Sequence, residues 1–181
     1  MDIRDTLLVE HSKANTMKIV NYIGKDQKRF DALMEYFLAN EYRVTQRAAM
    51  AVGHAADLYP FLIKKHLKPL LENLRRPDIH DAVKRNTVRL FDKHFDLPEE
   101  LLGTAAELCF IYLDNPQEAV AVRAFSMGVL YKICQQEPDL GNELIMVLED
   151  HLPHGTAGFK SRGSKILTKL RKQQKEREGM G

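Results

Sequence analysis

The chain of 181 residues has no tryptophan, two cysteines, ten glycines and seven prolines, so helix-breaking residues and disulfide candidates are both scarce. This composition excludes a collagen-like or low-complexity protein. No apolar run approaches the ~18 residues that suggest a transmembrane helix, and the N-terminus lacks the basic and then apolar layout of a secretory signal. Both cysteines lie in apolar stretches that are typical of reduced core thiols. We therefore expect a cytoplasmic protein without disulfide bonds.

The residues that are present indicate a folded α-helical protein. Hydrophobic residues make up 44% and charged residues 29% of the chain, which excludes a disordered one. Apolar residues recur every three or four positions over long stretches, and no segment alternates over the length of a strand. We expect helices at 2–11, 13–23, 27–39, 42–58, 60–75, 79–95, 98–114, 116–136, 140–151 and 157–174. The side chains expected to accept the first free N–H groups of helices are Asp26, Asp78, Asn115 and Asp139.

Two unrelated residue types recur with a period of about 38 residues, which indicates an internal repeat. The recurring arginines, each early in the second helix of a pair, are Arg47, Arg85, Arg123 and Arg162. The prolines that open the first helices recur with nearly the same period: Pro60, Pro98 and Pro138. A helix pair cannot bury its apolar face alone, so neighbouring pairs must stack into a solenoid.

Two of the predicted second helices resemble the valine–arginine–small-residue helix of HEAT repeats, in segments 42–53 and 121–130. This resemblance covers about residues 26–174 and implies an armadillo-like helical fold whose members mostly provide binding surfaces for many unrelated partners. Repeat four departs from the pattern at Gly155, which replaces a polar turn residue.

We therefore predict an all-α protein, a short right-handed superhelix of about four HEAT-like helix pairs with an N-terminal helical cap. The cap is expected at 1–25 and a basic, disordered tail at 175–181. The repeats are expected at 26–59, 60–97, 98–137 and 138–174.

Basic residues indicate where an anionic partner would bind. Residues 154–181 contain eight Lys or Arg against two Glu, although the whole chain has a net charge of only +2. Two interpretations of the repeated arginine stay open. In the first, the arginine donates to a carboxylate, an amide or a helix-end carbonyl of the neighbouring repeat, and Asn40, Asp78 and Asn115 are candidate partners. In the second, the arginines line the concave face and bind an acidic partner. The candidate binding residues are Arg43, Arg47, Lys84, Arg85, Arg89, Arg123, Lys160, Arg162, Lys165 and Lys169.

One glycine-rich segment, 154–165, leads into the last basic helix. Glycines before a basic helix can offer backbone N–H groups to a phosphate, but Ser164 precedes Lys165, which is the reverse of the order in a P-loop. An ordinary turn and a phosphate contact are both open interpretations of this segment.

We predict a non-enzymatic scaffold whose concave surface binds a protein partner of unknown identity. The sequence offers no catalytic constellation, metal site or cofactor motif, and no membrane contact is expected. The alternative is a nucleic-acid-binding protein with a basic concave track, related to the HEAT-like alkylpurine DNA glycosylases. Few aromatic residues lie among the basic ones, so the sequence provides little for base stacking.

Overall fold

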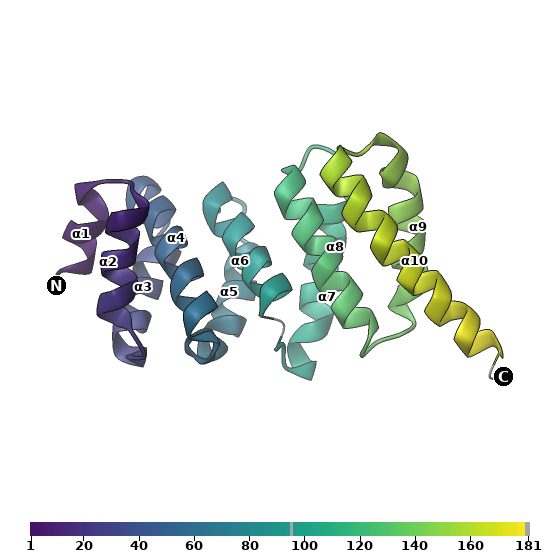
Figure 1. Cartoon of the computed structure of the whole chain (residues 1–181), viewed down its shortest axis with the longest axis horizontal. Coiled ribbons are helices and arrows are strands. Elements are labelled where there is room, and N and C mark those ends of the chain that lie inside the picture. The colour runs from purple at the N-terminus through teal and green to yellow at the C-terminus, as the bar shows by residue number, and fades with distance from the viewer. Residues whose placement is uncertain (95, 180–181) are drawn as a thin grey trace. The chain divides into compact units, whose positions relative to one another are not determined.

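The computed structural model describes residues 1–94 and 96–179, and all regular secondary structure in this part of the chain is helical (Figure 1). The elements are α1 Ile3–Val9, α2 Lys13–Ile23, α3 Gln27–Leu38, α4 Tyr42–Leu58, η1 Pro60–His66, α5 Leu67–Leu74, α6 Asp81–Lys93, α7 Glu99–Asp114, α8 Val120–Cys134, α9 Leu140–His151, η2 Leu152–His154 and α10 Ala157–Gly179.

These elements form successive helix pairs: α1 with α2, α3 with α4, η1–α5 with α6, α7 with α8, and α9 with α10. Here the second helices are α2, α4, α6, α8 and α10. The all-α prediction is confirmed, and neighbouring helices pack on each other as in a solenoid. None of the described helices combines the length and the apolar character needed to cross a bilayer.

The predicted helices match the observed ones to within two residues at most ends, with two larger differences. The helix predicted at 116–136 begins later, at Val120. α10 continues to Gly179, so the tail predicted to be disordered from residue 175 is helical up to that point. Residues 180 and 181 lie outside the described residues, and so does residue 95, the predicted end of the sixth helix.

The helix predicted at 60–75 is divided into a 3₁₀ segment, η1, and the shorter α5. Pro69 explains the division, because its ring clashes with the carbonyl four residues earlier and it has no N–H to donate. Pro69 is tolerated because it lies in the first turn of α5, where free N–H groups are expected.

Three of the four predicted helix caps were wrong. The side chain of Asp139, at the N-cap position of α9, makes no capping hydrogen bond. Asp26 caps α3 as predicted, since its carboxylate accepts the Arg29 N–H at 3.2 Å. His80, and not Asp78, caps α6 through its ring nitrogen. Because α8 begins at residue 120, Asn115 lies too early to cap it.

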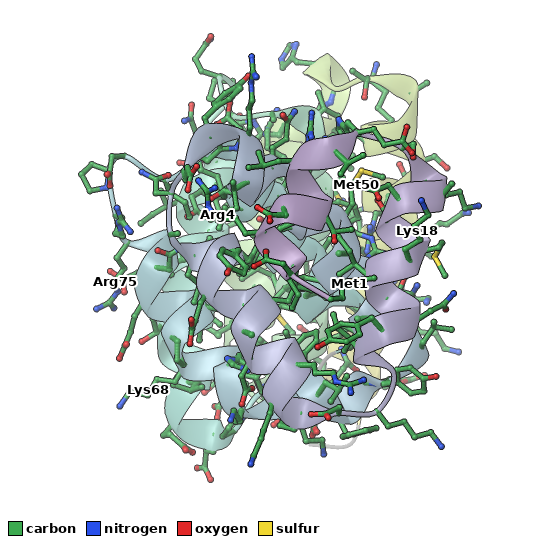
Figure 2. All side chains as sticks on the ribbon, turned by 90° about the vertical axis from the view of Figure 1, so that its left-hand side faces the viewer. Met1, Arg4, Lys18, Met50, Lys68 and Arg75 are labelled. Carbon is green, nitrogen blue, oxygen red and sulfur yellow. The ribbon has the colours of Figure 1, made fainter. Side chains whose placement is uncertain are left out.

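The chain divides into two compact units, 1–96 and 97–181. In the first unit, α4 packs against both α2 and α6, so the three second helices form one layer. The small residues Ala48, Ala49 and Ala51 on α4 are fully buried, as close packing of neighbouring helices requires. In Figure 2, Lys18 of α2 and Met50 of α4 lie on one side of this unit.

The opposite side of the first unit belongs to the first helices of the pairs. Figure 2 shows Lys68 on α5 and Arg75, just after it, on this side. Phe30 and Phe37 of α3 are fully buried. The apolar core therefore lies between the two layers of helices.

Polar contacts join the second and third helix pairs. Asn40 donates to the Asp78 carbonyl at 3.1 Å, and Asp31 of α3 accepts hydrogen bonds from Lys65 and from His66, whose Nε2 lies 2.7 Å away. Burial would raise the pKa of Asp31, but these hydrogen bonds and one from Gln27 lower it to about 2. The carboxylate of Asp31 is therefore ionised and joins the two pairs at neutral pH.

In the second unit, α7 and α9 form one layer, and α8 and α10 form the other. Phe159 of α10 is buried among them. Across the two pairs, His151 Nε2 lies 3.0 Å from the Asp114 carboxylate. Gln135 and Gln173 exchange hydrogen bonds through their amides. Cys109 and Cys134 are buried free thiols, as predicted.

Candidate binding surface

Two neighbouring second helices, α4 and α6, carry the predicted basic residues of the first unit. Arg43 on α4 and Arg85 on α6 are exposed, and neither forms a hydrogen bond or an ion pair within the described part of the chain. Lys84 is half-buried. Arg43 and Arg85 are therefore the two predicted arginines of this unit that stay open to a partner.

The other two predicted arginines of this unit are used within the fold. Arg47 Nη1 donates to the carbonyl of Leu7 at 2.7 Å, which ties α4 to the last turn of α1. Arg89 Nη2 donates to Asp57 Oδ2 at 2.8 Å. Arg47 thus follows the structural interpretation of the repeated arginine, since it bonds a helix-end carbonyl in the neighbouring pair.

Asp57, near the end of α4, is contacted by two cations of α6 and by the histidine at its C-cap. Besides Arg89, Lys93 Nζ lies 2.6 Å away and His94 Nε2 lies 2.8 Å away. Only 20% of the Asp57 side chain is exposed. Burial would raise the pKa of Asp57, but the hydrogen bonds from these three groups lower it below its usual value. This cluster fastens α4 to α6.

Arg123, the third repeated arginine, is 8% exposed and does not reach the surface. Its Nε donates to the Leu113 carbonyl at 3.0 Å, and its guanidinium lies 4.7 Å from the centre of the Phe159 ring. Burial lowers its pKa. Nη2 has no hydrogen-bond partner among the described residues. Arg123 therefore links α7, α8 and α10 and is not a ligand contact.

Of the acceptors predicted for the repeated arginines, a helix-end carbonyl of the neighbouring pair is confirmed for Arg47, whereas the three named side chains were wrong. Asn40 donates to Asp78 rather than accepting from Arg47. Asp78 forms its ion pair with Arg76 at 3.0 Å, and Asn115 accepts the N–H of a neighbour in the turn. Arg47 and Arg123 bind main-chain carbonyls at helix ends, of Leu7 and Leu113 respectively, and sequence spacing does not reveal which carbonyl each arginine reaches.

The remaining predicted residues lie on α10. Arg162 lies over the Phe125 ring of α8, 5.9 Å from its centre. Lys169 Nζ lies 5.5 Å from the centre of the Tyr131 ring. Lys165 is exposed between them. Lys160 precedes Lys165 by five residues, which places it about 140° away around the helix.

The glycine-rich segment before α10 has a packing explanation. A Cβ on Gly155 would lie 2.5 Å from Cδ1 of the Phe159 ring, and one on Gly163 would lie 2.5 Å from Leu152 Cδ2. The hydroxyl of Thr156 accepts the Phe159 N–H at 3.4 Å and so caps the helix itself. The geometry therefore favours an ordinary turn over a phosphate-binding loop.

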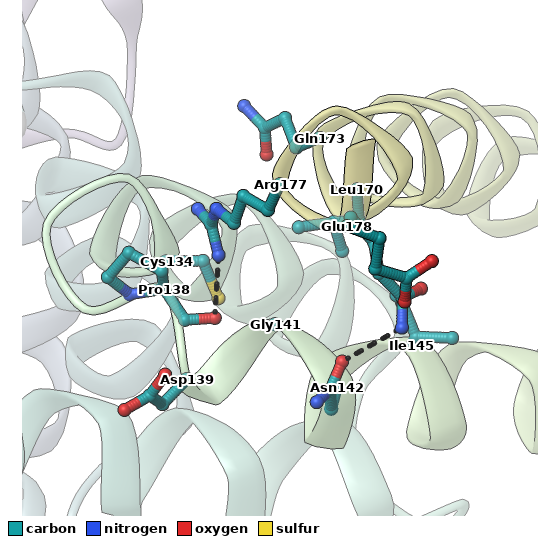
Figure 3. Close-up of a pocket in the computed structure, with 11 residues that line it drawn as sticks. Cys134, Pro138, Asp139, Gly141, Asn142, Ile145, Leu170, Gln173, Arg177 and Glu178 are labelled. Carbon is teal, nitrogen blue, oxygen red and sulfur yellow. Dashed lines mark hydrogen bonds between the residues drawn. The ribbon is translucent and has the colours of Figure 1, made fainter. Parts of the chain in front are cut away.

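A pocket of about 210 Å³ lies between α9 and the last turns of α10 (Figure 3). Arg177 donates across it to the Pro138 carbonyl at 3.4 Å, and Gln174 donates to Asn142. Cys134 contributes to its wall, and burial raises the pKa of that thiol to about 11. The thiol is therefore protonated at neutral pH, so it does not supply the thiolate that nucleophilic catalysis requires.

Two features of the site were missed by sequence reasoning. Asp57 was not identified as a cluster centre, and the aromatic residues Phe125 and Tyr131 were not placed beside basic ones. The 38-residue period could have predicted the aromatic neighbours, because Phe125 precedes Arg162 by 37 residues and Tyr131 precedes Lys169 by 38. Residues one period apart lie on neighbouring second helices.

Among the described residues, no group of three or more His, Cys, Asp or Glu side chains is arranged to hold a metal ion. A family model described as a HEAT repeat domain matches residues 3–170, from α1 into α10. Comparison with curated proteins and with solved structures finds no match.

Proposed function

Because the chain belongs to the HEAT-repeat family, we propose that it is a binding scaffold without catalytic activity that holds a protein partner on the second helices of its first unit, α2, α4 and α6. HEAT-repeat domains commonly bind proteins. In such repeats each pair presents an outer surface while its neighbours supply the core.

The charge of the second helices in the first unit carries this proposal. α2, α4 and α6 contain eight Lys or Arg residues and three Asp residues. Asp57 is occupied by Arg89, Lys93 and His94, and Asp92 is buried. The exposed charge of this layer is therefore positive, with Arg43 and Arg85 open. An acidic segment of a protein partner is the complementary ligand.

The contacts between pairs support a scaffold rather than a deformable surface. Arg47 joins α4 to α1, and the Asp57 cluster joins α4 to α6. These contacts fix the neighbours of α4, so that Arg43 and Arg85 are held on packed helices. A surface whose backbone is already ordered loses less conformational entropy on binding.

The test is affinity capture from native lysate with the full chain, after nuclease treatment to exclude proteins held through nucleic acid. We expect a stoichiometric protein partner that is lost when Arg43→Ser and Arg85→Ser are combined. The matched control combines Lys28→Ser and Lys68→Ser, which removes two exposed charges from first helices.

The control variant should retain the partner. Equal capture by all three proteins would place the partner elsewhere and refute this surface. Failure of the unmodified chain to retain any stoichiometric protein would refute the scaffold proposal itself.

A further inference from the structure

Charge in the second unit is segregated by layer. α7 carries four acidic residues and α9 carries three, and neither contains Lys or Arg. α8 carries Arg123 and Lys132 without any acidic residue, and α10 carries eight Lys or Arg against two Glu. The layer of second helices is therefore strongly positive, and the other layer is negative.

Three of these cations form a line on α10 beside α8. Arg162, Lys165 and Lys169 are three and four residues apart, which places them on one face of the helix over about 10 Å. We call this line the α10 stripe. Its two ends lie over rings of α8, Phe125 and Tyr131. Lys165 forms no ion pair with any residue that the structure describes.

This face lacks what a protein partner most needs. Protein interfaces are centred on buried aromatic or aliphatic anchors. Of the described residues of α8 and α10, only Val120 exposes a large apolar side chain, and it is the first residue of α8. The face offers cations and the partly exposed rings of Phe125 and Tyr131 instead.

We infer that the α8–α10 face binds single-stranded nucleic acid. The α10 stripe neutralises successive phosphates, while Tyr131 and the guanidinium of Arg162 over Phe125 provide flat surfaces for bases. Stacking on aromatic rings and arginine planes, together with a positive track, is how proteins hold single strands. In a duplex the bases already stack on one another, so stacking on Tyr131 and on the Arg162 guanidinium adds no binding energy. This inference names a second class of partner and goes beyond the protein scaffold proposed above.

Fluorescence anisotropy with labelled oligothymidylate, a duplex of the same length and a polyglutamate competitor tests the inference on the full chain. Three phosphate contacts predict that log K against log salt has a slope of about −2 for a single strand. Combining Lys165→Gln with Lys169→Gln should reduce the size of that slope by about 1.4.

Two further variants separate the contributions. Lys68→Gln with Lys160→Gln removes the same charge from residues that are not part of the α10 stripe and should leave the slope unchanged. Tyr131→Leu should weaken single-strand binding about fivefold or more with no change in slope, because it removes a stacking surface and no charge. Circular dichroism confirms that each variant is folded.

Four results would overturn the inference: no binding at low salt, an equal effect of the control variant, preference for the duplex, or equally effective displacement by polyglutamate. The last would indicate an acidic protein segment as the ligand of this face. A single strand bound with the predicted slope and lost with the stripe variant supports the inference.

Discussion

Replacing Asp57 with Asn tests the ion-pair cluster that fastens α4 to α6. The substitution keeps the size of the side chain and one acceptor oxygen, but leaves Arg89, Lys93 and His94 gathered without a counter-charge. Removing one partner of a buried ion pair costs about 3–5 kcal/mol. Half of the Lys93 side chain is exposed, so we expect a loss of about 2–3 kcal/mol after solvent screening.

Urea denaturation at pH 7, followed by circular dichroism, measures this loss. The melting temperature should fall by about 4–12 °C in a protein of this size. The matched control is Asp96→Asn, which breaks an exposed pair with Lys64 and should cost at most about 1 kcal/mol.

The difference between Asp57→Asn and the unmodified protein should also depend on pH. Because the pKa of Asp57 is lowered in the folded state, its stabilising contribution is complete above the unfolded value of about 3.9. The contribution is lost as the pH falls through that value toward the folded one. Between about pH 5 and pH 3 the difference should shrink by about 1 kcal/mol. A loss no larger than that of the control, or one independent of pH, would refute the cluster as a stabilising element.

Three further predictions follow from packing in the second unit. Gly155→Ala should lower the free energy of unfolding by about 1–3 kcal/mol because the added Cβ meets the buried Phe159 ring. In the same urea titration Gly158→Ala should not destabilise the protein, because no atom lies within contact distance of the Cβ added there. Arg123→Lys should lower the free energy of unfolding by about 1–3 kcal/mol, because the lysine ammonium cannot both replace the Nε hydrogen bond and stack on the Phe159 ring. Its control, the exposed Arg85→Lys, should change the free energy of unfolding by less than about 0.5 kcal/mol. Cys134 should react with a thiol reagent at pH 8 only as fast as the protein opens, since burial raises its pKa to about 11; rapid labelling of the folded chain would contradict its buried position.

Most of the helices could be predicted from the sequence because their signals are local. Apolar periodicity and flanking residues place α4 at 42–58 without reference to any partner. The errors have local causes that compete with periodicity, such as Pro69 within α5. The end of α10 was set too early because a polar helix that extends beyond its neighbour has no apolar face to reveal it.

The candidate surface was less predictable, since it depends on which partner the charged end of each long side chain reaches. Arg47 and Arg85 share a repeat phase, yet one donates to a main-chain carbonyl and the other is exposed. Sequence gives the helix face of an arginine but not the free carbonyl that captures its guanidinium. Arg123 shows the same limit, because only the packing of Phe159 explains its burial.

The side chains that join neighbouring pairs differ from one junction to the next. Between α4 and α6 the carboxylate of Asp57 meets two cations and a histidine, whereas between α8 and α10 the amides of Gln135 and Gln173 meet each other. The backbone is periodic, but its junctions are not interchangeable. Putting α8 in the place of α4 would set the amide of Gln135 against Arg89 and Lys93 without a carboxylate, so the order of the repeats is itself encoded in the sequence. An array rebuilt from one averaged repeat would keep the helices and lose that order.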